Sequence, residues 1–225
     1  MRIRRAPVAS EGFVYIGILA LLAWAAAIVG FTVLSFILAL LAILNVLFFR
    51  DPKRTIPNEP DAYLSPADGV IIFVEDSYER DFLNSNELKI SISLAVYDCH
   101  INRMPTTGKV VATKYTHGSF HIANMPGWLY PENMKKKSDD NERLSTLIET
   151  PDGKQIVVSQ IAGFLARRIV SYAEPEMEFK SGERFGIIKF GSRVDLYLPE
   201  GSLLDVKVGQ RVWAGETILA RMRNY

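Results

Sequence analysis

The stretch Ile187-Ile-Lys-Phe-Gly-Ser-Arg-Val-Asp-Leu-Tyr-Leu-Pro199 places a Gly-Ser step between two runs of apolar and β-branched residues. Runs of this composition are typical of strands. Because glycine adopts backbone conformations that other residues avoid, Gly191 can present its carbonyl to the side chain that follows it. The step is therefore either a bulge or turn in a sheet, or the position of a reactive serine.

Ser192 is the candidate reactive group. Its hydroxyl can attack the Gly191 carbonyl and convert the amide into an ester. Elimination at that ester would break the chain and turn Ser192 into a pyruvoyl group, an electrophile that no encoded side chain supplies. A Gly-Ser step alone does not decide between the two interpretations, so the rest of the chain must.

The N-terminal part is strongly apolar, because residues 13–49 contain no charged side chain. One helical span needs about 20 residues, and a single helix over this whole run would overshoot the hydrocarbon core. Gly30 lies where a tight turn would divide the run into two helices. Basic residues flank both ends, which favours a membrane hairpin with both ends in the cytoplasm. A cleaved signal peptide is the alternative, but cleavage after Ala27 would leave enough apolar residues to span a membrane.

The remaining chain, residues 50–225, has the size of one ordinary domain. With 26 basic and 25 acidic residues in the whole chain, the net charge gives no reason to expect a nucleic-acid partner. A single cysteine excludes an internal disulfide framework. After a basic segment (1–12), the hairpin (13–49) and a linker (50–64), residues 65–225 form the expected domain. Its expected strands are 70–74, 88–96, 108–113, 144–149, 155–161, 185–190 and 194–198.

The pattern of these strands predicts a mainly β (α+β) fold. Residues 88–96 alternate as a half-buried strand does, and no segment keeps a helical period for more than about three turns. In residues 204–220, two glycine turns separate short strands, as in the compact barrels that carry biotin or lipoyl groups. The turn Ser65-Pro-Ala-Asp-Gly-Val-Ile71 resembles the matching opening of such a barrel. We therefore expect a barrel-sandwich, biotinyl-like β domain, without lipoylation because no lysine occupies a suitable hairpin tip.

Three histidines are candidates for proton transfer or metal binding. His100 follows the 88–96 strand, and its imidazole can take a proton from a serine and return one later; a structural histidine is the alternative. His117 and His121 have the spacing of a metal pair on a helix, but Gly118 disfavours a helix there. We therefore expect no metal site.

Other polar residues suit binding or positioning. Asp68, in Pro66-Ala-Asp-Gly69, is either ordinary turn chemistry or a carboxylate that orients a histidine or acts as a base. Arg167 and Arg168 can hold a carboxylate or phosphate. The segment 124–141 combines aromatic residues with lysines, so it is either a membrane-surface segment or a solvated loop.

Taken in order, the motifs resemble those of the short branch of the phosphatidylserine decarboxylase family, over nearly the whole chain. The motifs that carry the resemblance are Phe48-Phe-Arg-Asp-Pro-Lys-Arg54, Ser65-Pro-Ala-Asp-Gly69, Asp98-Cys-His-Ile-Asn-Arg-Met-Pro105, Asn141-Glu-Arg143, Gln160-Ile-Ala-Gly163 with Ala166-Arg-Arg168, Gly182-Glu-Arg-Phe-Gly186 and Phe190-Gly-Ser-Arg-Val-Asp195. Each motif is short, but their order is highly specific.

This resemblance implies self-cleavage between Gly191 and Ser192. It would give a large chain (1–191) and a small chain (192–225) that begins with pyruvoyl. The two would form a heterodimer, with the oligomeric state beyond that left open. The implied reaction converts phosphatidylserine to phosphatidylethanolamine through a Schiff base, at the inner membrane and facing the cytoplasm.

The resemblance also implies roles for single residues. Asp68 matches the acidic residue for self-processing, and His100 matches the decarboxylation histidine. Long-branch members carry a second histidine where this chain has Arg103, and a guanidinium is a poor base. The base for cleavage is therefore either His100, which we favour, or His121. We expect the substrate contacts to come from Arg103, His121, Arg167 and Arg168.

Two other functions are compatible with parts of the pattern. One is a pyruvoyl-dependent decarboxylase of a soluble amino acid, which would leave the apolar hairpin without an obvious use. The other is a membrane-tethered binding module built on the biotinyl-like barrel, in which Ser192 would stay intact. Whether the chain is cleaved distinguishes the binding module, which stays intact, from both kinds of decarboxylase.

Overall fold

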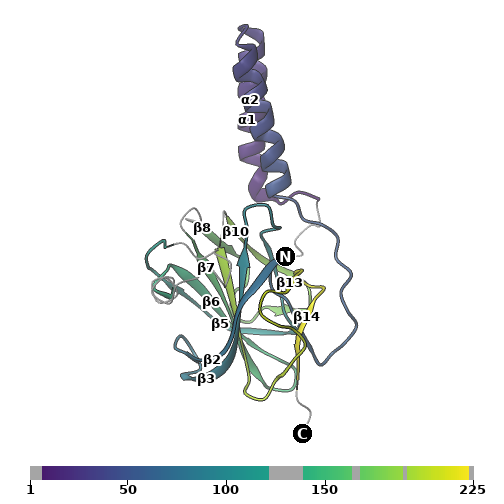
Figure 1. The fold of residues 1–225 in the computed structure, drawn as a ribbon, viewed down its shortest axis with the longest axis vertical. Helices are drawn as coiled ribbons and strands as arrows, with labels where there is room; N and C mark the ends of the chain where they lie inside the picture. Colours follow the sequence, from purple (N-terminus) through teal and green to yellow (C-terminus); the bar gives the residue numbers. More distant parts are fainter. Residues whose placement is uncertain (1–6, 122–138, 164–167, 190–191, 223–225) are drawn as a thin grey trace. The chain divides into compact units, whose positions relative to one another are not determined.

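A computed structural model of the chain describes residues 7–121, 139–163, 168–189 and 192–222. Contacts divide the chain into two compact units, Met1–Lys53 and Arg54–Tyr225. The first unit is helical and the second is built from strands (Figure 1).

Two antiparallel helices form the first unit: α1 (Ser10–Ile28) and α2 (Thr32–Phe48). The turn between them uses Gly30, whose φ of +88° lies in the left-handed region that glycine favours. The helices are joined where the Ser35 hydroxyl donates a hydrogen bond to the Ala23 carbonyl at 2.9 Å. Among the described residues, α1 alone is long and apolar enough to cross a bilayer, and α2 is two residues shorter, at 17.

The second unit contains one large sheet and two small ones within the described residues. The large sheet has the order β13 (Arg211–Val212), β2 (Gly69–Glu79), β3 (Ser85–Leu94), β11 (Ser192–Leu198), β7 (Gln155–Ala162), β6 (Arg143–Glu149), β5 (Gly108–Thr116) and β9 (Glu178–Phe179). One small sheet has the order β4 (Ile101–Arg103), β10 (Arg184–Lys189) and β8 (Arg168–Ser171). The other has the order β1 (Ala62–Leu64), β14 (Ile218–Arg221) and β12 (Leu203–Leu204). The expected mainly β fold, preceded by apolar helices, is confirmed.

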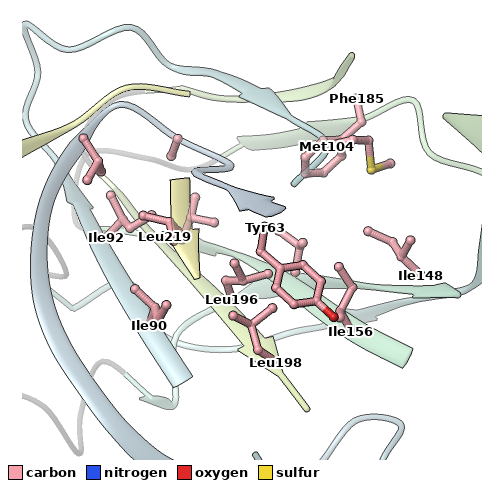
Figure 2. Packing of buried hydrophobic residues seen from close by; sticks show 14 of the residues in the cluster. Tyr63, Ile90, Ile92, Met104, Ile148, Ile156, Phe185, Leu196, Leu198 and Leu219 are labelled. Atoms are coloured by element: carbon pink, nitrogen blue, oxygen red, sulfur yellow. The ribbon is translucent and has the colours of Figure 1, made fainter. Parts of the chain in front are cut away.

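One face of the large sheet carries the apolar core. Alternate residues of β11, such as Leu196 and Leu198, point into it together with Ile90 of β3. Figure 2 shows these side chains packed around Tyr63 of β1, so the large sheet and a small sheet share this core. Burial of each such side chain contributes about 1.5–3 kcal/mol, and this is the main term that holds β11 in the middle of the sheet.

The opposite face of β3 is buried as well, which corrects the expectation of a half-buried strand. From Lys89 to Leu94 every residue of β3 is buried. Its polar side chains, among them Ser91, lie opposite Asp195 of β11. Asp195 in turn lies 3.0 Å from the Arg193 guanidinium. Alternation of polar and apolar residues predicted the two faces correctly, but the polar face is covered by an ion-pair network rather than by water.

Asp81, in the loop between β2 and β3, anchors part of this polar face. Its side chain is only 3% exposed. It accepts hydrogen bonds from Arg143 at 2.9 and 3.1 Å and from the Ser145 hydroxyl at 2.7 Å. Burial alone would raise the pKa of this carboxyl, but the bonds from Arg143 and Ser145 and the charge of Arg143 outweigh it and hold the pKa well below its usual range.

Replacing Asp81 with asparagine is expected to lower the free energy of unfolding at pH 7 by about 3 kcal/mol, because it leaves the Arg143 charge largely uncompensated. Since folding lowers the pKa of Asp81, its stabilisation is complete above about pH 5 and fades as the pH falls below about 4. Thermal unfolding of the full chain in detergent at a series of pH values checks this. The control is Asp152→Asn, at a carboxylate that is 45% exposed. The expectation would be contradicted if Asp81→Asn were as stable as the wild type at pH 7. It would also be contradicted if the difference in free energy of unfolding between the two proteins were as large in acid as at pH 7.

Candidate active site

Several strands of the large sheet begin or end at the same end of the sheet, and Ser192 lies there. β11 begins at Ser192, which pairs with Leu94, the last residue of β3. On its other side Ser192 pairs with Ala162, the last residue of β7. The next strand after β3, β2, begins at Gly69, opposite Val212 at the end of β13. The loops that enter and leave the central strands therefore lie at this end of the sheet, which we call the Ser192 end.

Ser192 is completely buried, and its side chain lies on the apolar face of the sheet with Val194 and Leu196. Among the described residues its Oγ has no hydrogen-bond partner. A buried hydroxyl without a partner costs about 1–3 kcal/mol. Because the buried Ser91 hydroxyl shares this property, it is the position of Ser192 directly after Gly191 that makes it the candidate reactive group. Gly191 lies outside the described residues.

The described strands on either side of the Gly-Ser step belong to different sheets. β10 ends at Lys189 in a three-stranded sheet, and β11 starts at Ser192 in the large sheet. The step therefore falls where the chain crosses between sheets, not within one strand. His100 lies at this crossover, because its carbonyl accepts a hydrogen bond of 3.2 Å from the Ile188 amide of β10.

His100 is fully buried, and its ring is held by the turn that precedes it. Nδ1 lies 2.9 Å from the Asp98 carbonyl oxygen. Because a carbonyl can only accept, Nδ1 carries the proton in the neutral ring and Nε2 carries the basic lone pair. Asp98 is fixed by its own carboxylate, which accepts the Ala95 amide at 2.8 Å and pairs with Arg211. The turn thus sets both the tautomer and the orientation of His100.

Asp68 lies at the same end of the sheet, one residue before β2, and is closely held by donors. Nη2 of Arg54 donates to both carboxylate oxygens, at 2.9 and 2.7 Å, and the Ala214 amide donates to Oδ1 at 2.8 Å. The Arg54 side chain is 7% exposed and also reaches Glu216 at 3.0 Å. Burial disfavours the charged guanidinium, but the Asp68 charge and hydrogen bonds prevail and raise the pKa of Arg54. Asp68 is thus an organised carboxylate rather than an ordinary turn residue.

Asp68→Asn is expected to slow self-cleavage at least about tenfold and to destabilise the fold by about 3–5 kcal/mol, because a buried Arg54 loses its main partner. The cleaved fraction over time on a denaturing gel and the melting temperature in detergent measure the two effects. Glu216→Gln is the matched control, since it removes the more exposed partner of the same guanidinium and should cost below about 1 kcal/mol. Cleavage of Asp68→Asn at the wild-type rate, with the fold retained, would remove Asp68 from the processing machinery.

Asn141 ties the segment that carries His121 to the strand beside Ser192. Its side-chain amide donates to the carbonyls of His121 and Ala162, each at 2.8 Å, and its Oδ1 accepts the His121 amide at 2.8 Å. Ala162 is the β7 neighbour of Ser192. The backbone of His121 is therefore fixed near the Ser192 end, while its side chain is exposed.

Arg103 follows His100 by three positions, and its side chain contacts the turns at Gly182 and Gly215. Its guanidinium donates to the Gly182 carbonyl at 3.2 Å, and its stem packs close to Gly215. Burial raises the pKa of Glu216, but the Thr55 amide, Arg54 and, with a smaller effect, Arg103 outweigh it and lower that pKa. Asn102, the residue before it, is fully buried and accepts a hydrogen bond of 2.8 Å from Gln160.

Two of the expected substrate-binding residues are not placed by these contacts. Arg167 lies outside the described residues, and of Arg168 the structure gives the backbone, which pairs with Lys189. Most of the segment 124–141 also lies outside them. Conversely, Arg54, Asp98 and Asn141 make positioning contacts that the sequence does not specify. All three lie within motifs quoted above, and this was the available signal.

Comparisons with known proteins identify the family. The sequence profile of the phosphatidylserine decarboxylase family matches residues 41–220. A phosphatidylserine decarboxylase proenzyme of Desulfotalea psychrophila is 43% identical over 216 residues, which cover 96% of this chain and 97% of that protein. The proenzyme of Geobacter metallireducens is 38% identical, with 97% and 98% covered, and that of Burkholderia vietnamiensis is 40% identical, with 96% of each covered. The resemblance seen in the motifs is therefore confirmed, and the chain belongs to the phosphatidylserine decarboxylase family.

Proposed function

We propose that this protein decarboxylates phosphatidylserine to phosphatidylethanolamine, at a pyruvoyl group that it makes from its own Ser192. The observation that carries this proposal is the buried Oγ of Ser192, which has no hydrogen-bond partner among the described residues and lies where the chain passes from one sheet to another. The relatives are named proenzymes, which fits a chain that must be processed before it acts.

Self-cleavage with formation of the pyruvoyl group uses the chain and one water molecule. Oγ of Ser192 attacks the Gly191 carbonyl carbon, the C–N bond breaks, and the two residues are then linked by an ester. Loss of the Ser192 α-proton expels the Gly191 carboxylate and leaves a dehydroalanine. Water then releases ammonia and completes the pyruvoyl group. A base is needed to remove the hydroxyl proton and the α-proton.

His100 is the base that the contacts favour. It is buried at the crossover, and the Asp98 carbonyl holds Nδ1–H so that Nε2 is the basic atom. Arg103 occupies the position of a second family histidine but cannot accept a proton. Its contacts, to Gly182 and towards Glu216, lie on the opposite side of β4 from Asn102. His121 is the alternative base.

A pyruvoyl group supplies a carbonyl that can bind an amine covalently and take up the electron pair left when carbon dioxide departs. The residues around Ser192 fit such a group, because a fully buried site keeps a reactive carbonyl from bulk water. In the decarboxylation, His100 would deliver the proton that replaces the lost carboxylate. Asp68, Arg103, Arg167, Arg168 and His121 would organise the site or hold the headgroup.

The two chains produced by cleavage would remain a heterodimer. β11, the first strand of the small chain (192–225), lies between β3 and β7 of the large chain (1–191) and pairs with both. The amide of Ala214, also in the small chain, is bonded to Asp68. Separation would therefore open the centre of the sheet and its core.

A membrane location follows from the substrate and from α1, which can cross a bilayer. Basic residues on both sides of the apolar run favour a domain that faces the cytoplasm at the inner membrane. An enzyme held at the bilayer meets a lipid substrate at high effective concentration.

Carbon dioxide release from carboxyl-labelled substrates tests the substrate class. The full chain in detergent should release labelled carbon dioxide from phosphatidylserine and not from free serine. Release from free serine instead would assign the protein to the decarboxylases of soluble amino acids. If the chain stays uncut and releases carbon dioxide from neither substrate, the membrane-tethered binding module remains as the function.

A further inference from the structure

Three large side chains lie exposed at the Ser192 end of the sheet. Tyr97 is 71% exposed, Val96 is 47% exposed and Trp213 is 46% exposed. With the adjacent Arg211 they form what we call the aromatic patch. An exposed group of Trp, Tyr and an aliphatic residue next to a cation has the composition of a surface that contacts the bilayer interface.

The patch is built on ordered parts of the fold. Arg211 and Trp213 flank the buried Val212, the last residue of the strand β13 that is labelled in Figure 1, and both are exposed. The Arg211 guanidinium lies over the Tyr97 ring, 5.8 Å from its centroid. The Trp213 amide is fixed by the Thr217 hydroxyl at 3.0 Å.

The same two segments hold the candidate catalytic groups. Tyr97 precedes Asp98, whose carbonyl orients His100 and whose carboxylate pairs with Arg211. Trp213 precedes Ala214, whose amide binds Asp68. On each segment, a residue of the patch thus directly precedes the residue that contacts a candidate catalytic group: Tyr97 precedes Asp98, and Trp213 precedes Ala214.

A lipid substrate would explain why the aromatic patch lies beside the candidate active site. Moving the acyl chains of phosphatidylserine into water is strongly unfavourable, since every methylene group adds to the cost. The headgroup amine must nevertheless reach a position that is buried inside the domain. Both conditions are met when the domain contacts the bilayer beside the site and only the headgroup leaves the interface.

We propose that the aromatic patch is the surface by which the catalytic domain docks on a bilayer that contains phosphatidylserine. The proposal rests on the function proposed above. Tyr97 and Trp213 enter the interfacial region, and Arg211 attracts the anionic headgroups. Docking presents the headgroup to the Ser192 end while the acyl chains stay in the bilayer.

The test compares two substrates of the same full-length protein in proteoliposomes. One substrate is long-chain phosphatidylserine within the bilayer. The other is a short-chain phosphatidylserine dissolved in water below its micelle concentration, added to phosphatidylcholine proteoliposomes. For Tyr97→Ser combined with Trp213→Ser, the ratio of kcat/KM on the bilayer substrate to kcat/KM on the dissolved substrate should fall at least about tenfold.

The matched control combines Tyr78→Ser with Leu203→Ser, two side chains of similar exposure, 56% and 55%, outside the patch. This variant should keep the wild-type ratio. An unchanged ratio in the patch variant, or an equal fall in the control, overturns the proposal. A wild-type protein that is neither cleaved nor active on the dissolved substrate would instead contradict the proposed function itself.

Fluorescence gives a second readout that does not depend on turnover. In a full chain with Trp24→Phe and Trp128→Phe, Trp213 is the remaining tryptophan. Its emission should be quenched in proteoliposomes of brominated phosphatidylcholine relative to unbrominated ones. Equal emission in the two would place Trp213 in water and overturn the docking surface.

Discussion

Ser192→Ala is expected to leave the chain uncut and without decarboxylase activity, both reduced at least about 1,000-fold. The reason is chemical, since alanine offers no oxygen to attack the Gly191 carbonyl and cannot become a pyruvoyl group. The fold should tolerate the change, because the lost hydroxyl is buried and lacks a partner among the described residues. A denaturing gel and carbon dioxide release measure the two effects.

Ser91→Ala is the matched control for this experiment. Ser91 is also fully buried, and its Oγ likewise lacks a partner among the described residues. It lies on β3, next to β11, but on the opposite face of the sheet from Ser192. Ser91→Ala should be cleaved and active like the wild type. Activity in an uncut Ser192→Ala protein would refute the pyruvoyl mechanism.

His100→Ala is expected to lower decarboxylation by about 10²–10⁴-fold, the usual contribution of a positioned proton-transfer group. Self-cleavage should also slow, because His100 is the favoured base for that step. Activity must be expressed per cleaved molecule, so that the two steps are separated. Cleaved fraction by gel and carbon dioxide release by the purified cleaved form give the two rates.

His121→Ala is the comparison that decides between the two bases. The backbone of His121 is fixed by Asn141, but its side chain is exposed. His121→Ala should therefore be cleaved at nearly the wild-type rate. Normal cleavage of His100→Ala together with slow cleavage of His121→Ala would transfer the processing role to His121.

The sequence was sufficient to predict the parts of the fold that depend on local pattern. The strands around Ser192 and the turn at Gly30 follow from composition and from glycine chemistry, and the structure contains them. The apolar face of β11 follows from alternation along the strand. The fold class was predicted for the same reason, since mainly β composition and regular turns are visible in one dimension.

The contacts that organise the site could not be predicted, because they join residues through strand register and buried charge. Nothing local indicates that Arg54 of the linker reaches Asp68, or that a side chain of Asn141 bonds the strand beside Ser192. The buried polar face of β3 was missed for a related reason. A serine looks solvent-facing in a pattern, and only the arrangement of Asp81 and Arg193 shows that it is covered.

The mass of the purified, full-length protein tests the central claim most directly. Cleavage predicts two chains, 1–191 and 192–225. The small chain should be lighter, by the mass of one ammonia, than the same segment beginning with serine. A single uncut chain of 25.3 kDa from an active preparation would contradict the account.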